Sequence, residues 1–167
     1  MDNQDVNSKI LCCLLAAGLT LSSTAVVAFD HQHQMFNQVL NDVVRLSPNK
    51  RQTRVDYGLL NKQPEQLNRY LAALSSVKQS EYKLWTDDEQ LSFLINAYNA
   101  FTLQLINQNY GKFQNGKVES IKDLGGFFSS PWKQSFFTLL EEKHSLDDID
   151  HDMIRVWFKR SGIHAAF

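Results

Sequence analysis

Cysteine is nearly absent from this sequence of 167 residues, because its two cysteines, Cys12 and Cys13, both lie close to the N-terminus. The chain from residue 14 onward therefore offers no disulfide, no thiol nucleophile and no thiolate ligand for a metal ion. The sequence also lacks a glycine-rich phosphate-binding loop and the Gly-x-Ser-x-Gly motif of serine hydrolases. These absences remove thiol chemistry, cysteine-based zinc sites and P-loop nucleotide binding from the body of the chain.

Charge is missing from the segment Ile10 to Phe29, which follows Lys9 and carries Val-Val-Ala at positions 26–28. This pattern is typical of a secretory signal peptide, and we predict that residues 1–28 are removed. The alternative is an uncleaved N-terminal anchor, because the run is long enough to span a bilayer. The cysteines lie too early in the run to carry a lipid anchor. We expect an exported protein, either periplasmic or extracellular.

The sequence also has no large excess of positive or negative charge. The sequence has 17 basic and 18 acidic residues, and removing residues 1–28 takes away two acids and one base, which leaves the two signs equal. No bulk electrostatic field then attracts nucleic acid. We expect no nucleic-acid partner, and membrane contact only through an uncleaved N-terminal segment. Residues 29–167 suffice for one domain core, with a helical region over 29–79 and the main domain over 80–167.

A long helix is the clearest element in the sequence. Thr86 and Glu89 have the spacing of a capping box, which predicts that a helix begins here and runs to about Tyr110. Apolar residues occupy nearly every face of the segment, so we expect it to lie inside the core. A polar stripe interrupts this pattern, and we interpret the stripe as a buried polar site: Ser92, Asn96, Asn99 and Thr102.

Shorter elements flank this helix. We expect helices over 31–46 and from Pro64 to 75–76, with a short extended piece over 55–60 between them. On the C-terminal side we expect one helical turn from Ser120, closed by Gly125 and Gly126 with a positive φ. A strand over 134–140, a turn over 141–143 and a helix capped by Ser145 and Asp148 follow. The fold class is therefore predicted as α+β, a helix-dominated single domain with a small hairpin or sheet.

Several motifs in one consistent order resemble a known family. They are Trp85 with Glu89, Phe93-Leu94-Ile95-Asn96-Ala97-Tyr98-Asn99-Ala100, Ser120-Ile121-Lys122-Asp123-Leu124-Gly125, Ser130-Pro131-Trp132, and Ser145-Leu146-Asp147-Asp148-Ile149 followed by His151. Together they resemble the domain family of unknown function numbered 547, over roughly residues 80–167. The family is similar, at the level of suspected fold, to papain-like thiol hydrolases, which implies an incomplete papain-like fold here.

The resemblance also implies that something is missing. In the family, the equivalent of residues 162–166 continues into a cysteine-containing segment, whereas this sequence stops at Phe167. If the family's suspected chemistry rests on that thiol, His164 is its neighbouring imidazole, and the nucleophile of the pair is absent. The resemblance therefore implies a truncated and catalytically inactive relative of a thiol-hydrolase-like domain.

Three residues are candidate catalytic groups. His164 lies in an apolar run and is the favoured imidazole. His151 follows Asp147 by four residues on a predicted helix, so the carboxylate could orient the ring, although an exposed ion pair explains the same spacing. Glu89 is the third candidate, with helix capping as its default role. An intact enzyme that uses these groups without a thiol is the least favoured hypothesis.

Three further residues are candidate binding groups. Asn96 and Asn99 could orient a substrate or an imidazole, while the alternative is that they tie a neighbouring loop to the helix. Trp132 belongs to an aromatic segment that would contact a ligand if the chain is a non-catalytic binding module, the second hypothesis. We expect no cofactor and no metal. His31 would suit Cu(II) or Ni(II) only if cleavage left a free amine at Phe29, and we expect a non-binding terminus there.

Overall fold

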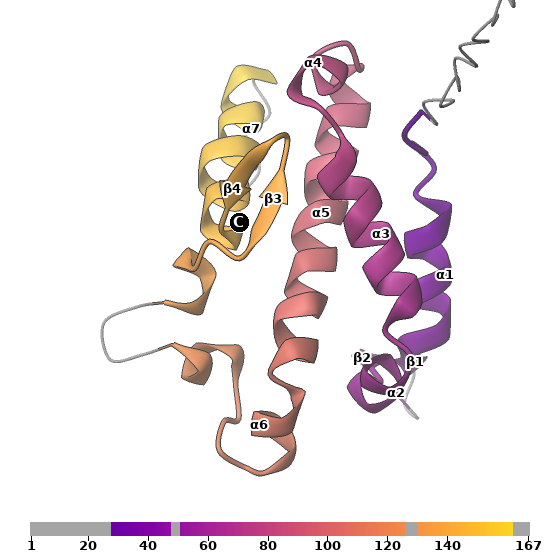
Figure 1. Cartoon of the computed structure of the whole chain (residues 1–167), viewed down its shortest axis with the longest axis vertical. Helices are drawn as coiled ribbons and strands as arrows, with labels where there is room; N and C mark the ends of the chain where they lie inside the picture. The colour runs from indigo at the N-terminus through magenta and orange to yellow at the C-terminus, as the bar shows by residue number, and fades with distance from the viewer. Residues whose placement is uncertain (1–27, 48–50, 126–129, 162–167) are drawn as a thin grey trace, which may run out of the picture.

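Three helices form the framework of the chain, and they lie side by side in Figure 1. The computed structural model describes residues 28–47, 51–125 and 130–161. Helices α1 (Gln34–Val43), α3 (Glu65–Ser76) and α5 (Asp87–Gln108) pack in that order, with α3 in contact with both neighbours. A small hairpin and the C-terminal helices cover the other side of α5. The fold is thus α+β and dominated by helices, as predicted.

Helix α5 begins as the capping box predicts. The Thr86 side chain accepts a hydrogen bond from the Glu89 amide at 3.3 Å, and the Glu89 carboxylate accepts one from the Thr86 amide at 2.8 Å. The helix ends at Gln108, and a short helix, α6 (Tyr110–Gln114), follows directly. Buried residues lie on several faces of α5: Phe93, Leu94, Ala97, Ala100, Phe101, Leu103, Leu105 and Ile106.

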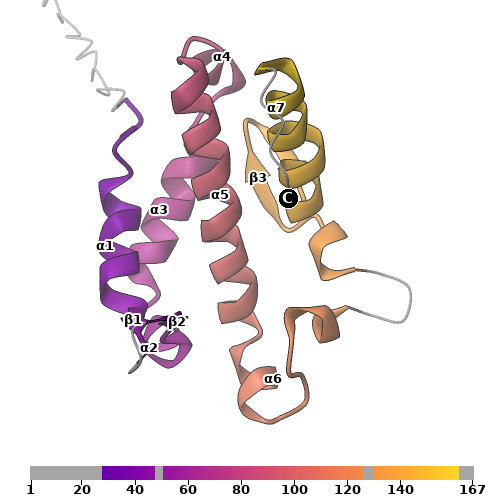
Figure 2. The ribbon, with the colours of Figure 1, turned by 180° about the vertical axis from the view of Figure 1, so that it is seen from behind.

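The interpretation of its polar stripe as buried is wrong. Asn99 is exposed, and Ser92, Asn96 and Thr102 are only half-buried. Ile95, on the same side of the helix, is 41% exposed. Figure 2 shows α5 in front of α3, between α1 and α7. The stripe therefore lies toward the face of α5 that its neighbours leave open, apart from Ser92, whose hydroxyl contacts the buried His33 ring.

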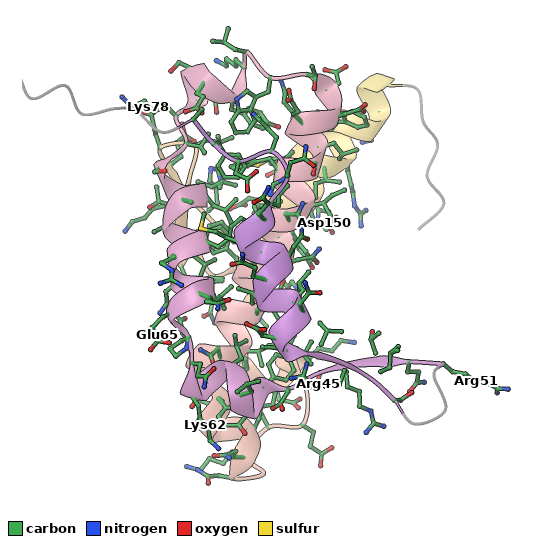
Figure 3. The ribbon with its side chains drawn as sticks, turned by 90° about the vertical axis from the view of Figure 1, so that its right-hand side faces the viewer. Arg45, Arg51, Lys62, Glu65, Lys78 and Asp150 are labelled. Carbon is green, nitrogen blue, oxygen red and sulfur yellow. The ribbon has the colours of Figure 1, made fainter. Side chains whose placement is uncertain are left out.

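The N-terminal region differs from the expected helix over 31–46. Helix α1 ends at Val43, and β1 (Val44–Leu46) pairs antiparallel with β2 (Thr53–Val55). This hairpin projects from the helical body in Figure 3. The extended piece expected over 55–60 is instead α2 (Tyr57–Lys62), because the Asp56 carboxylate caps it by accepting from the Leu59 amide at 2.9 Å.

Helix α3 is confirmed in position and in its buried stripe. The residues that it buries are Leu67, Tyr70, Leu71 and Leu74. A single turn of helix, α4 (Gln79–Tyr82), then leads into α5. Among the described residues, no helix is both long and apolar enough to cross a membrane.

The C-terminal region begins with two short 3₁₀ helices, η1 (Ile121–Leu124) and η2 (Pro131–Lys133). The helical turn from Ser120 is confirmed, since Ser120 and Asp123 form a capping box. Gly125 has φ of −73°, so the expected positive φ is wrong there, while Gly126 lies outside the described residues. The 3₁₀ turn ends in extended backbone, which does not require a left-handed residue.

The expected hairpin is present, but its turn is one residue earlier than predicted. Strand β3 (Phe137–Leu139) pairs with β4 (Glu142–His144), and the turn residues Leu140 and Glu141 have φ of 50° and 71°. Two consecutive positive φ values match the twist of a tight two-residue hairpin. Neither Leu nor Glu favours a positive φ, so the residue types do not indicate the position of this turn.

The last described helix has two parts. Residues Asp148–Ile154 form a π-helix, η3, and α7 (Arg155–Ser161) continues it. The predicted cap is confirmed: the Ser145 amide donates to Asp148 Oδ2 at 2.7 Å, and the Asp148 amide donates to Ser145 Oγ at 3.2 Å. The side chains of Ile149 and Ile154 are buried, and η3 packs against α5.

Candidate functional site

Glu89 is positioned by its own helix terminus. Its Oε2 atom accepts hydrogen bonds from the amide and the hydroxyl of Thr86, both at 2.8 Å. These bonds, above all the one from the amide, hold the pKa of Glu89 below its ordinary value. Its Oε1 atom lies 3.9 Å from Nδ1 of His31. Glu89 is thus an ionised capping residue beside an imidazole, and its catalytic role stays a prediction.

The two candidate asparagines differ in their surroundings. The Asn96 side-chain amide donates to the Ser92 carbonyl at 2.9 Å and to the Ser92 hydroxyl at 3.3 Å, one turn back in the same helix. Within the part of the chain that the structure describes, it ties no neighbouring loop to α5. Asn99 is exposed, and no hydrogen bond of its side chain occurs among the described residues. The binding roles of both amides stay predictions.

A buried imidazole forms an arrangement that sequence reasoning missed. Nδ1 of His33 lies 2.7 Å from the Tyr70 hydroxyl, and its Nε2 lies 3.2 Å from the Ser92 hydroxyl. His33 is 5% exposed and has φ of 50°. Burial lowers the pKa of His33, against the opposing effect of Asp30, so the ring is neutral at pH 7. The N-terminal segment is thereby joined to α3 and α5 through one side chain.

Aromatic rings surround this connection. The Phe29 ring stacks on Trp85 with centroids 5.4 Å apart, and its edge contacts with Phe93 and His33 lie at 5.2 and 5.4 Å. His31 packs edge-on against Trp85 at 4.5 Å. Such pairs add to the stabilisation that comes from burial of the rings. These residues therefore form a packing cluster that fixes the N-terminal segment, with both ring nitrogens of His33 already occupied.

His151 lies in an acidic part of η3. Its Nδ1 is 3.6 Å from Asp147 Oδ1 and 3.4 Å from Asp150 Oδ2, while Asp150 also contacts Arg155 at 3.6 Å. The ring is half-exposed, which is the geometry of a surface ion pair. Among the described residues, no hydrogen bond or ion pair joins His151 to Glu89, Asn96 or Asn99. The expected catalytic and binding groups are therefore not assembled into one contact network.

Trp132 and His164 are the remaining predicted site residues. Trp132, in η2, is half-buried and packs against the hydrophobic core. His164 lies outside the described residues. The aromatic segment that includes Trp132 contributes core packing as well: the Phe137 ring stacks on Phe101 with centroids 3.8 Å apart. Phe127 and Phe128 of the same segment also lie outside the described residues.

A groove of about 450 Å³ lies between α4, the β3–β4 hairpin and the η3–α7 helix, and we call it the α4–α7 groove. Its volume is in the range of small-molecule sites. Two aromatic rings, Tyr82 and Trp157, line it together with both charged and neutral polar groups. Its lining residues are Gln79, Tyr82, Lys83, Gln90, Leu94, Leu140, Glu142, His144, Asp152, Met153, Val156 and Trp157.

His144 is the imidazole of this groove, and it has an acidic neighbour on η3. Its Nδ1 lies 3.9 Å from Asp148 Oδ2. The Ser145 amide donates to the same Asp148 oxygen and holds the pKa of that carboxyl below its ordinary value. An ionised carboxylate thus lies near Nδ1 of His144. The spacing of four residues from His144 to Asp148 was the available signal.

One family model matches the chain, over residues 82–165, and its description is "Protein of unknown function, DUF547". The match includes every lining residue of the α4–α7 groove except Gln79. His33 and Tyr70, by contrast, precede the matched region. Neither the curated proteins nor the solved structures include a match to the chain.

Proposed function

Because the chain belongs to the DUF547 family of proteins of unknown function, we propose that it is an exported protein that binds a small ligand in the α4–α7 groove without thiol-based hydrolysis. The observation that carries this proposal is the groove itself, where the imidazole of His144, beside the Asp148 carboxylate, lies among aromatic and polar side chains within the family domain. Sites for small ligands combine an apolar lining with a few fixed polar groups in this way.

The sequence argues against thiol chemistry. A papain-like mechanism requires a thiolate and an imidazole within about 3 Å of each other. Residues 14–167 contain no cysteine, so no imidazole of the folded chain has such a partner within the chain. We propose recognition of a ligand as the role of the groove.

The lining favours an uncharged polar ligand with an apolar face. Tyr82 and Trp157 offer ring surfaces, and Gln79 and Gln90 offer amide donors and acceptors. Lys83 and the acids Glu142 and Asp152 balance one another to within one charge. A strongly charged ligand would meet groups of its own sign in the groove, whereas a neutral polar ligand would not.

The test is a ligand-observed NMR screen of the full chain against mono- and disaccharides, amino acids and dipeptides, with hits mapped by amide chemical shifts. We expect hits to shift amides of α4, β4 and α7. His144→Gln and Trp157→Phe should weaken binding, and the second variant keeps a ring in place so that the fold is retained.

A matched control comes from a second cavity of about 250 Å³ between α1, α2 and α3, which Arg69 lines. Arg69→Gln should leave binding unchanged. Hits that map to this second cavity, or that bind the two groove variants as tightly as the unchanged chain, would contradict the proposal.

A further inference from the structure

The turn of the β3–β4 hairpin points toward α4, and both elements line the α4–α7 groove (Figure 1, Figure 2). In this turn the Glu141 carboxylate accepts a hydrogen bond from the Gln79 amide, with 3.2 Å between Oε2 and the nitrogen. The two residues are 62 positions apart in the sequence. A side chain of the hairpin therefore caps a helix that belongs to another part of the chain.

Helix α4 has no side-chain cap from its own segment. It is a single turn, and the residue before it, Lys78, provides no acceptor for the first amides. The first amides of a helix lack partners within the helix and need an acceptor from outside. Apolar packing holds the rest of the segment, because Val77 is buried and Tyr82 packs against the hydrophobic core. Glu141 thus supplies the acceptor that the start of α4 lacks.

The turn that carries Glu141 has an unfavourable backbone conformation. Leu140 and Glu141 have φ of 50° and 71°, a combination for which hairpins prefer asparagine and glycine. The Leu140 side chain is buried and lines the groove, and its burial stabilises the turn in this form. Glycine at position 141 would remove the strain there, but it would also remove the carboxylate. Strained residues of this kind cluster at ligand sites, which makes Glu141 a candidate for a role in one.

The bond joins two elements that both supply groups to the groove. Gln79 lines the groove from α4, and Leu140 lines it from the hairpin turn. Tyr82, on the same helical turn as Gln79, and His144, on the strand after the hairpin turn, line it as well. A shift of α4 relative to the hairpin would therefore change the distances between the groups that a ligand touches.

We propose that Glu141 is a positioning residue for the α4–α7 groove: its bond to the Gln79 amide holds α4 against the hairpin and fixes the spacing of the two elements. Glu141 itself is exposed and is not among the residues that line the groove, so it acts through the elements that it joins. The inference rests on the proposed function, because it concerns the same site. Binding should follow the presence of the bond, whereas stability should follow the backbone strain as well.

Four side chains at position 141 separate the bond from the strain. Glutamate has both, and Glu141→Gln keeps an acceptor of the same length on the same backbone. Glu141→Ala loses the bond and keeps the strain, while Glu141→Gly loses both. We expect Glu141→Ala to lower the midpoint of thermal unfolding. Glu141→Gly should leave the midpoint near that of the unchanged chain, because the relief of strain offsets the lost bond.

The first readout needs no ligand. Hydrogen exchange of the Gln79 amide, followed by NMR, should be about fivefold faster in Glu141→Ala and Glu141→Gly than in the unchanged chain. Glu141→Gln should retain most of the protection. The control is Glu119→Gln, which removes an exposed carboxylate outside the groove and should leave the exchange unchanged. Unchanged exchange in Glu141→Gly would overturn the proposal, because the bond would then not hold α4.

The second readout is the affinity for the strongest hit of the NMR screen. We expect Glu141→Ala and Glu141→Gly to weaken binding alike, by about fivefold, because the groove spends less time in the form that binds. Glu141→Gln should restore most of the affinity. Weaker binding in the alanine variant alone would mean that Glu141 acts only on stability, and would overturn the inference.

Two further outcomes distinguish the inference from the proposed function. Full binding in a Glu141→Gly variant whose Gln79 amide exchanges faster would overturn the inference and leave the ligand groove intact. A screen without hits would contradict the proposed function instead, and the exchange of the Gln79 amide would still decide whether Glu141 holds α4.

Discussion

Nδ1 of His33 lies 2.7 Å from the hydroxyl oxygen of Tyr70, although the two residues are 37 positions apart in the sequence. This bond joins the segment before α1 to the buried side of α3. The other ring nitrogen of His33 reaches Ser92 on α5. One imidazole therefore connects the segment before α1 with α3 and α5. The contribution of its two hydrogen bonds to the free energy of unfolding can be measured.

Tyr70→Phe should lower the free energy of unfolding by about 1–3 kcal/mol, because it leaves a buried ring nitrogen without a partner. Urea denaturation followed by circular dichroism measures the change. The control is Tyr57→Phe, since Tyr57 is half-buried and its hydroxyl forms no hydrogen bond among the described residues. Equal losses in both variants would show that the His33–Tyr70 bond contributes nothing specific.

The free energy of unfolding should fall as the pH drops below the ordinary His33 pKa of 6.5. Burial lowers the pKa of His33 in the folded state, so as the pH falls the unfolded chain binds the proton first. Protonation then favours the unfolded state and lowers the free energy of unfolding. Nearby Asp30 opposes this effect, and nearby His31 adds to it. Above pH 6.5 the contribution of His33 levels off.

His33→Gln provides the comparison for this pH dependence. Urea denaturation between about pH 7.5 and about pH 5.5 should give a shallower slope of unfolding free energy against pH for the variant than for the unchanged chain. Only the slope is diagnostic, because the substitution also removes hydrogen bonds. Parallel slopes would mean that His33 titrates alike in both states.

Thr86→Ala should cost about 1 kcal/mol of unfolding free energy, because the Glu89 amide at the start of α5 loses its acceptor. Thr86→Ser keeps the hydroxyl and should retain most of the stability. Thermal unfolding of the two variants side by side measures the difference. If alanine and serine behave alike, the capping box seen in the structure does not stabilise the helix.

Phe137→Ala should destabilise the chain by about 3–5 kcal/mol, since it removes a buried ring stacked on Phe101. Phe136 is only half-buried, so Phe136→Ala should cost clearly less. Chemical denaturation of both variants distinguishes core packing from a surface role for this aromatic segment. A larger loss at Phe136 would reverse the assignment.

Local signals in the sequence predicted the elements that depend on neighbouring residues. The apolar stripe of α3 and the capping boxes at Thr86, Ser120 and Ser145 all act within a few residues, and each is present. The same periodicity did not separate a helix over 31–46 from α1 followed by a strand, because the pairing of β1 with β2 joins residues across a turn.

The candidate site was harder to predict for a related reason. His33 owes its surroundings to contacts with Tyr70 and Ser92 that form only when distant elements pack. His144, by contrast, has a local contact with Asp148 that the four-residue spacing could have indicated. The polar stripe on α5 suggested burial because apolar residues flank it in sequence. Whether a neighbouring element covers that face is decided by tertiary packing, which leaves Asn99 exposed.

The most direct test of the central claim measures binding and turnover on one sample of the full chain. The strongest hit of the NMR screen is titrated by calorimetry, and amide and ester derivatives of that hit are followed for hydrolysis in parallel. We predict that binding weakens in His144→Gln while every derivative is cleaved only at its uncatalysed rate. Cleavage above that rate which disappears in His144→Gln would contradict the account.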